Sequence, residues 1–134
     1  MSPALEVQIR ARWPGWFGNY SDYTKSLMGH GFQCSDGWYQ LLVQTFERIE
    51  PHVIAFNREP AEIGTQFEIL EVKEKFGTLR VISSGTNERI IFAFLHARDL
   101  SSEICAECGA PGKLRTEYLQ TLCAVCWSER EYGS

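Results

Sequence analysis

The chain has 134 residues, a length typical of one domain or of one domain with a small appendage. Hydrophobic residues make up 44% of it, and it contains four Trp, five Tyr and eight Phe, which is sufficient for a packed core. The formal net charge is −4. No stretch approaches the roughly 18 consecutive apolar residues of a membrane-spanning helix, and residues 1–6 do not read as a secretory signal. We therefore expect a cytoplasmic protein that does not attach to a membrane.

The first third of the chain begins with a short amphipathic stretch. Leu5 to Arg12 predicts a helix, which Pro14 ends. The segment that follows, residues 13–32, is rich in aromatic residues and glycine but has neither a helical nor a strand period. Two interpretations stay open: the rings cap the core from an irregular loop, or they form an exposed surface for a partner. The residues assigned to that tentative partner-binding surface are Trp13, Trp16, Phe17, Tyr20 and Tyr23.

A long amphipathic helix is predicted from Asp36 onward. Apolar residues and a threonine recur at positions i, i+3, i+4, i+7, i+8 and i+11, which defines one helical face. Pro51 disfavours the helical conformation in the residue before it, so we expect Glu50 to be the last full helical residue. Residues 51–62 then read as a connector. The members of the apolar face are Trp38, Leu41, Leu42, Thr45, Phe46 and Ile49.

Residues 66–82 predict a β-hairpin, because apolar and charged residues alternate on both sides of a turn at residues 75–78. The apolar parity changes between Ile69 and Leu70, so we expect a bulge there or burial on both faces. Thr86 or Asn87 can cap a second helix, expected over residues 88–101. That helix is apolar over a wide arc. It must therefore lie under the hairpin and the first long helix together, or present part of its surface to a second copy or a partner.

Four of the five cysteines form two C-x-x-C pairs that are separated by fourteen residues. Such pairs present four thiolates to one ion about 2.3 Å away, the pattern of a structural zinc site. The alternatives are two disulfides or four free thiols. Gly109, directly after the first pair, permits a positive φ, and the spacer is long enough for a short hairpin. The predicted Zn²⁺ ligands are Cys105, Cys108, Cys123 and Cys126.

The charge pattern bears on the partners that we expect. From Asp99 to the C-terminus there are twice as many acidic residues as basic ones, whereas a nucleic-acid-binding ribbon usually carries a basic excess. A local basic face stays an alternative; its members would be Lys73, Lys75, Arg80, Lys113 and Arg115. An enzyme is a third alternative, in which the fold would bring together Cys34, Asp36 and His52. No phosphate-binding loop or catalytic motif is recognised, so no catalytic residue is assigned.

Three motifs in fixed order carry a resemblance to a known family. They are Cys34-Ser35-Asp36-Gly37-Trp38, the string from Val72 to Arg80, and the cysteine tail from Cys105 to Cys126. Together they resemble a widespread family of small bacterial and bacteriophage proteins with a C-terminal zinc ribbon. The chain departs from that pattern at residues 116–118, where relatives tend to carry a Gly-Trp turn. The resemblance implies a bacterial or phage setting and a zinc-ribbon tail, and it brings no activity, substrate or catalytic residue.

These observations combine into one expectation. We predict an α+β fold in which two main helices pack with a β-hairpin in residues 1–104, followed by a four-cysteine zinc ribbon in 105–127 and a tail in 128–134. We expect a structural Zn²⁺ to hold the ribbon, because zinc-finger peptides gain about 10–16 kcal/mol from the metal. The predicted function is a non-enzymatic protein-interaction module, and a phage modulator or inhibitor of a host system is the form that we expect. A protein partner is expected, and a homodimer and nucleic acid remain open.

Overall fold

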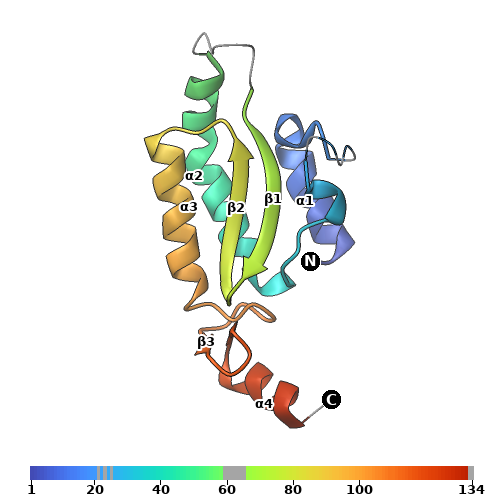
Figure 1. Cartoon of the computed structure of the whole chain (residues 1–134), viewed down its shortest axis with the longest axis vertical. Helices are drawn as coiled ribbons and strands as arrows, with labels where there is room; N and C mark the ends of the chain where they lie inside the picture. Colours follow the sequence, from blue (N-terminus) through green and yellow to red (C-terminus); the bar gives the residue numbers. More distant parts are fainter. Residues whose placement is uncertain (21, 23, 25, 59–65, 133–134) are drawn as a thin grey trace.

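The computed structural model describes the chain except for residues 21, 23, 25, 59–65 and 133–134. The fold is α+β, as predicted. Three helices and a two-stranded antiparallel sheet form the upper body in Figure 1, and a second small sheet with a short helix projects below them. Within the described residues, no helix is both long and apolar enough to cross a membrane.

The aromatic segment near the N-terminus belongs to the core. Helix α1 (Pro3–Arg12) is followed by a 3-10 turn at Pro14–Phe17. The rings of Trp13 and Trp16 stack with centroids 5.4 Å apart, and Trp16 meets Phe46 edge to face. The Trp13 indole N–H also donates to Glu50 at 2.6 Å, which satisfies the polar atom of a buried ring.

The tentative assignment of these rings to a partner surface is therefore corrected. Trp13, Trp16 and Phe17 are each no more than 8% exposed. Tyr20 is half-buried beneath the guanidinium of Arg10, 3.9 Å from its ring centroid. Tyr23 lies outside the described residues. Rings of this size remove much apolar area from water when they are buried, and this free energy favours their packing in the core beside α1.

Helix α2 (Tyr39–Arg58) is longer than predicted and contains Pro51 within it. The prediction that Glu50 ends the helix, and that a connector starts at Pro51, is wrong for residues 51–58. Tertiary contacts hold this second half. Val53 is buried, the carbonyl of His52 accepts from Asn87, and the side chain of Asn57 accepts from the Phe67 N–H. Such contacts offset the hydrogen bond that proline cannot make. Residues 59–62 of the expected connector lie outside the described part.

The predicted hairpin is present as β1 (Glu68–Lys75) and β2 (Thr78–Ser84). The register shifts between Ile69 and Glu71, which confirms the expected bulge. The free edge of β1 is covered by an earlier segment, because Gln33 bonds to the backbone of Val72 and Glu74 there. Ile69, Val72 and Leu79 reach the core.

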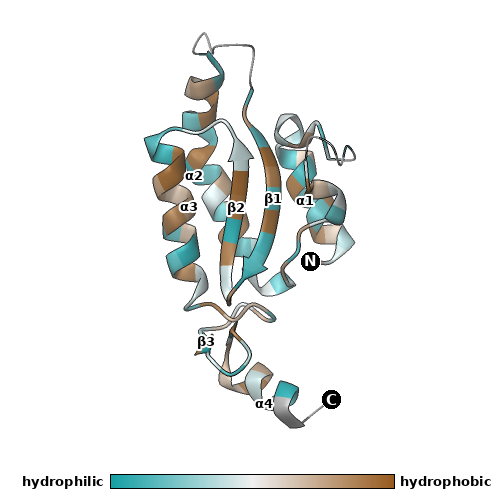
Figure 2. Ribbon diagram, in the orientation of Figure 1, coloured by the Kyte–Doolittle hydropathy of each residue, from teal (hydrophilic) through white to brown (hydrophobic). Residues whose placement is uncertain are grey.

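Helix α3 (Glu88–Ser101) starts where the sequence predicts, with the side chain of Asn87 accepting from the Ile90 N–H. It packs against α2 and β2, and its buried residues include Ile90, Ala93 and Ala97. Phe94 and Leu100 are partly buried against the core, and part of the apolar arc is left exposed. Figure 2 shows apolar residues on the outer side of this helix. Three of them are clearly exposed: Ile91, Phe92 and Leu95.

The C-terminal part consists of β3 (Lys113–Arg115), β4 (Gln120–Leu122) and α4 (Ala124–Tyr132). The two strands pair in antiparallel fashion, with Lys113 opposite Leu122. The hairpin was predicted, but α4 was not. The helix starts directly after the third cysteine and continues beyond residue 127, into the segment that the sequence analysis treats as a tail.

Candidate metal centre

The four predicted ligands come together at one point. The sulfurs of Cys105, Cys108, Cys123 and Cys126 all lie within 4.8 Å of one another. The Cys108 and Cys123 sulfurs are 3.7 Å apart. That separation is far longer than the roughly 2.05 Å of a disulfide, and it is close to the ~3.8 Å edge of a tetrahedron with 2.3 Å metal–sulfur bonds. The four cysteines are therefore arranged to hold one metal ion, and the disulfide alternative does not fit.

The first pair of ligands sits on a tight turn between α3 and β3. The Gly109 N–H donates to the Cys105 carbonyl at 2.9 Å, and Gly109 has a φ of 81°. This left-handed conformation is strained for other residues, which accounts for glycine directly after the second ligand. The Ala106 N–H donates to the Thr121 carbonyl at 2.9 Å, so the turn is also joined to β4.

The second pair lies where β4 runs into α4. Cys123 ends the strand, and its sulfur accepts from the Cys126 N–H at 3.4 Å. Trp127 follows in the first turn of α4 and packs beside Leu122 and the buried cysteines. Its ring lies 5.5 Å from that of Tyr118, on the hairpin that joins the two pairs. The helix thus covers the sulfur cluster on one side.

The thiols differ in how easily they ionise. Burial raises the pKa of Cys105, but backbone hydrogen bonds from Cys123, Cys108 and Glu107 outweigh it, and the pKa falls to about 7. For Cys126, burial and the neighbouring sulfurs raise the pKa. At Cys108 a backbone hydrogen bond from Ala110 is outweighed by the thiols of Cys105 and Cys123, so its pKa is also raised. Four sulfurs so close together cannot all ionise without a cation between them.

The first ligand turn is attached to the core at Gly37. The Gly37 N–H donates to the Ala106 carbonyl at 2.8 Å. The backbones approach so closely that a Cβ on Gly37 would lie 2.1 Å from the Cys105 carbonyl oxygen. The next residue, Trp38, is fully buried, and its indole N–H donates to the Ile104 carbonyl at 2.9 Å. The metal turn is therefore part of the same packed unit as α2.

The second attachment is at the tip of the β1–β2 hairpin. The buried Thr121 hydroxyl donates to the Gly77 carbonyl at 2.7 Å. A Cβ on Gly77 would lie 2.3 Å from the Leu114 side chain and 3.1 Å from the Leu119 carbonyl. The tip of the β1–β2 hairpin thus directly contacts the β3–β4 hairpin of the ribbon. The three sequence motifs, which are far apart in the chain, meet around the metal centre.

No family model, curated protein or solved structure matches the chain.

The residues of the alternative enzymatic site do not line a common cavity among those found in the described residues. Cys34 lines one cavity and Asp36 another, and His52 lines neither of these two. Burial raises the pKa of Cys34 to about 12, so its thiol stays protonated. Asp36 accepts from the Ser2 N–H at 2.7 Å. These positions do not form a nucleophile with a neighbouring base.

The residues of the alternative basic face are divided. Lys73, Lys75 and Arg80 line a groove on the upper body. Lys113 and Arg115 lie on β3, where Arg115 donates to the Leu122 carbonyl and lies 5.4 Å from the Trp127 ring centroid.

The sequence analysis missed the residues that attach the ribbon to the core. Gly37, Gly77 and Thr121 make these contacts. The two glycines were considered only as parts of motifs that carry the resemblance, and Thr121 only as part of the expected hairpin between the cysteine pairs. Their role depends on pairs of backbones that are far apart in the chain, such as Gly37 and Ala106. The available signal was a glycine within each of two motifs, and a glycine alone does not identify the backbone that lies against it.

Proposed function

We propose that the protein is a non-enzymatic module that binds Zn²⁺ for structural reasons and engages a protein partner through its folded surface. The observation that carries the proposal is the cluster of four sulfurs within 4.8 Å. Four thiolates in tetrahedral arrangement favour Zn²⁺ over cations that prefer oxygen ligands. They also complete the coordination sphere, so no position is left for a reacting water.

The metal would hold a part of the chain that has little core of its own. The buried residues around the sulfurs are few, with Leu122 the largest fully buried side chain among them. Small units of this kind depend on a metal for their folding energy. The bound ion would then fix the ribbon against Gly37 and Gly77, and with it the tip of the hairpin.

The interaction role is supported by apolar side chains that the monomer leaves in water. On α3, Phe92 is 61% exposed and Leu95 is 41% exposed, and on β2, Ile82 is 46% exposed. Exposed apolar residues that gather on neighbouring elements mark interaction sites more often than isolated ones do. A second copy of the chain is an alternative occupant.

The cellular setting follows from the resemblance and the thiols. We place the protein in the cytoplasm of a bacterium or of a phage-infected host, as a modulator or inhibitor of a host system. Five cysteines without a disulfide suit a reducing compartment. The acidic net charge of −4 would favour encounter with a basic region of the target.

The metal part is tested by elemental analysis of protein purified without added metal. We expect one Zn²⁺ per chain in the wild type and little in the Cys108→Ser variant. A variant with all four cysteines changed to serine is the matched control. Equal zinc content in that variant and the wild type would defeat the proposal, and stoichiometric iron would replace zinc as the resident metal.

The interaction part is tested by capture of tagged, zinc-loaded protein from bacterial lysate, with and without nuclease. A stoichiometric protein that is retained after nuclease treatment supports the module. Retention that nuclease abolishes would instead support the second candidate, a nucleic-acid-binding ribbon. Lys73, Lys75 and Arg80 around one groove are the observation that keeps this candidate open, and binding that weakens steeply with salt would be its signature.

A further inference from the structure

A groove of about 280 Å³ is lined by residues of β1, β2 and α3, and none of the four clustered cysteines lines it. Its floor and walls include Val81 and Ile82 from the strand and Phe94 and Leu95 from the helix. Ile91 lies one helical turn before Leu95 and extends the apolar wall, since residues four apart share a face. Ile82, Ile91 and Leu95 are between 41% and 46% exposed.

The groove is positive in a protein that is acidic overall. Lys73, Lys75, Arg80 and Arg98 line it, and none of its lining residues is acidic. A nearby carboxylate, Glu71, forms an ion pair with Lys73 at 2.8 Å. Three cations therefore remain to meet an incoming negative charge, although the chain as a whole carries −4.

On the side away from β1, the edge of β2 is bonded to α3 at Leu79, and among the described residues no hydrogen bond joins Val81 on that side. The Leu79 N–H donates to the Ser101 hydroxyl on α3 and not to β1. Because successive residues of a strand direct their backbone groups to opposite edges, Val81 also directs its N–H and carbonyl away from β1. The opposite residue, Val72, fits this register, since its carbonyl accepts from Gln33 on the other edge of β1. The β1 edge is thus covered by Gln33, and on the β2 edge the backbone groups of Val81, a residue that lines the groove, have no partner among the described residues.

We propose that this groove binds an extended, acidic segment of the partner protein, which lies along β2 and hydrogen-bonds to its backbone at Val81. This inference rests on the proposed role as a protein-interaction module. Backbone groups of the segment would pair with Val81, and alternate apolar side chains would lie on Ile82 and Leu95. Carboxylates on the segment would pair with Lys75, Arg80 and Arg98, so the cations of the groove favour a negatively charged partner segment.

Charge and backbone chemistry select this occupant over two others. A second copy would bring the same cations against these cations, which disfavours pairing of β2 with its own copy. Nucleic acid would match the charge, but its backbone cannot continue the hydrogen-bond ladder of a strand edge. A peptide with alternating acidic and apolar residues satisfies both features.

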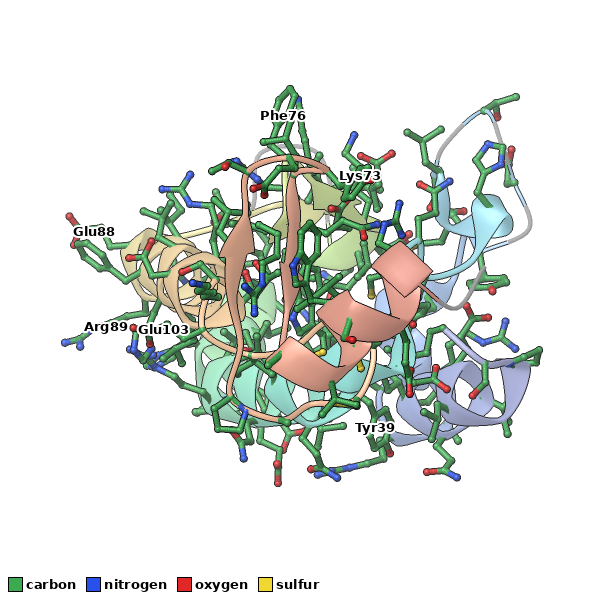
Figure 3. The ribbon with its side chains drawn as sticks, turned by 90° about the horizontal axis from the view of Figure 1, so that it is seen from below. Tyr39, Lys73, Phe76, Glu88, Arg89 and Glu103 are labelled. Carbon is green, nitrogen blue, oxygen red and sulfur yellow. The ribbon has the colours of Figure 1, made fainter. Side chains whose placement is uncertain are left out.

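The experiment is a selection of random extended peptides, displayed on phage, on the immobilised zinc-loaded protein. The test variant is Lys75→Glu with Arg98→Glu, and the control is Arg58→Glu with Arg89→Glu, which changes the net charge equally. Arg89 lies on α3 but outside the groove, and in Figure 3 it stands on a different side of the molecule from Lys73. Thermal unfolding and zinc content verify that both variants fold.

We expect the selected peptides to be rich in Asp and Glu that alternate with apolar residues. Their affinity should fall by about tenfold or more in the test variant and by less than about twofold in the control. Methylation of the peptide backbone N–H groups on the side that faces β2 should weaken binding similarly. Amide exchange at Val81 should slow when such a peptide is bound.

Selection of peptides without acidic residues, or equal binding to both variants, would overturn the inference. Tighter binding of single-stranded oligonucleotides than of any selected peptide would replace it with nucleic acid, and dimerisation lost in the test variant would replace it with a second copy. If both variants capture the same partner equally from lysate, the proposed function would hold, but the partner would not bind in the groove. If acidic peptides bind in the groove but no partner is captured from lysate, the groove inference would stand and the proposed function would fail.

Discussion

Gly37 joins the metal centre to the core because its lack of a side chain lets two backbones touch. The site tolerates no Cβ, since one would lie 2.1 Å from the Cys105 carbonyl oxygen and 2.5 Å from two backbone atoms of Ala106. These atoms belong to a ligand turn and cannot move without moving a sulfur. A residue far from the cysteines in sequence therefore controls the position of a metal ligand.

We predict that Gly37→Ala destabilises the protein by roughly 2 kcal/mol or more, because overpacking forces a backbone shift. Chemical denaturation followed by circular dichroism measures the change, and elemental analysis reports zinc retention. Gly15→Ala is the matched control, since a Cβ at Gly15 meets nothing within 4 Å. It should leave stability unchanged or raise it by less than about 1 kcal/mol. Equal effects of the two variants would contradict the attachment at Gly37.

Metal affinity should depend steeply on pH. The pKa of Cys105 is lowered to about 7, while those of Cys108 and Cys126 are raised. In the metal-free protein most ligands are therefore protonated at neutral pH, and binding must displace their protons. As pH falls, more protons compete, so affinity decreases. We expect a loss of roughly 10²–10³-fold per pH unit below pH 7, measured by competition with a chromophoric chelator. A flat profile would show that fewer thiolates bind.

Cys34 should behave differently from the other four cysteines. Its side chain is 8% exposed, and burial raises its pKa to about 12. Since the thiolate is the nucleophile, we expect alkylation by iodoacetamide in the native protein to be roughly 10²–10³-fold slower than for a free thiol. Mass spectrometry of zinc-loaded protein at mildly alkaline pH measures it, and denaturation in a chelator should expose all five. Fast native alkylation at Cys34 would reopen a reactive role.

At the scale of elements, α2 is the clearest case of packing that overrides a local rule. Pro51 sits in the helix interior with its ring exposed, and it removes one backbone hydrogen bond. Residues beyond it are held by Asn87 and Phe67, and the Phe56 ring fills the space next to Gly85. The energy of these contacts is available only when the hairpin and α3 are already in place.

We predict that Pro51→Ala stabilises the protein by about 1–3 kcal/mol, because alanine restores the missing N–H and favours the helix. The gain should appear as a higher midpoint in urea without a change in slope. Val53→Ala provides a contrast on the same turn of α2. It should destabilise by roughly 1–3 kcal/mol, since Val53 is only 1% exposed. A loss of stability in Pro51→Ala would show that α2 needs the proline itself at this position.

At the scale of the whole molecule, the ribbon and the upper body form a connected unit. Figure 1 shows the tip of the β1–β2 hairpin directly above the ribbon. The contacts there are the Thr121 hydroxyl on the Gly77 carbonyl and the Ser35 hydroxyl on Glu107. Loss of the metal should therefore lower the local stability of the hairpin tip, and this effect should decrease along β1 and β2 away from the tip.

We predict that chelation of the metal raises amide exchange in two places, the ribbon from Cys105 onward and the turn at residues 76–78. Helix α3 should keep its protection, because it packs on α2 and β2 and not on the sulfurs. Hydrogen exchange with mass spectrometry, before and after chelation, measures both regions. Global loss of protection would show that the core cannot fold without the metal, and unchanged exchange at 76–78 would contradict the coupling.

Patterns that lie within a few residues of one another were sufficient for much of this protein. The cysteine spacing predicts the four-sulfur cluster, Asn87 caps α3 as expected, and the change of parity after Ile69 marks the bulge. Each of these follows from local backbone geometry or from a ligand pair that one turn holds. The α+β class follows from the periodicity of residues 36–50, 66–82 and 88–101.

Only the tertiary structure decided the rest. It buries Trp13 and Trp16 in the core, carries α2 through Pro51, adds α4, and sets Gly37 and Gly77 against the ribbon. It also draws cations from two strands and a helix into one groove. These features depend on contacts between residues far apart in the chain, whose energy comes from excluding water and fitting shapes. Sequence periodicity reports which side of an element is apolar, but it does not report what lies against that side.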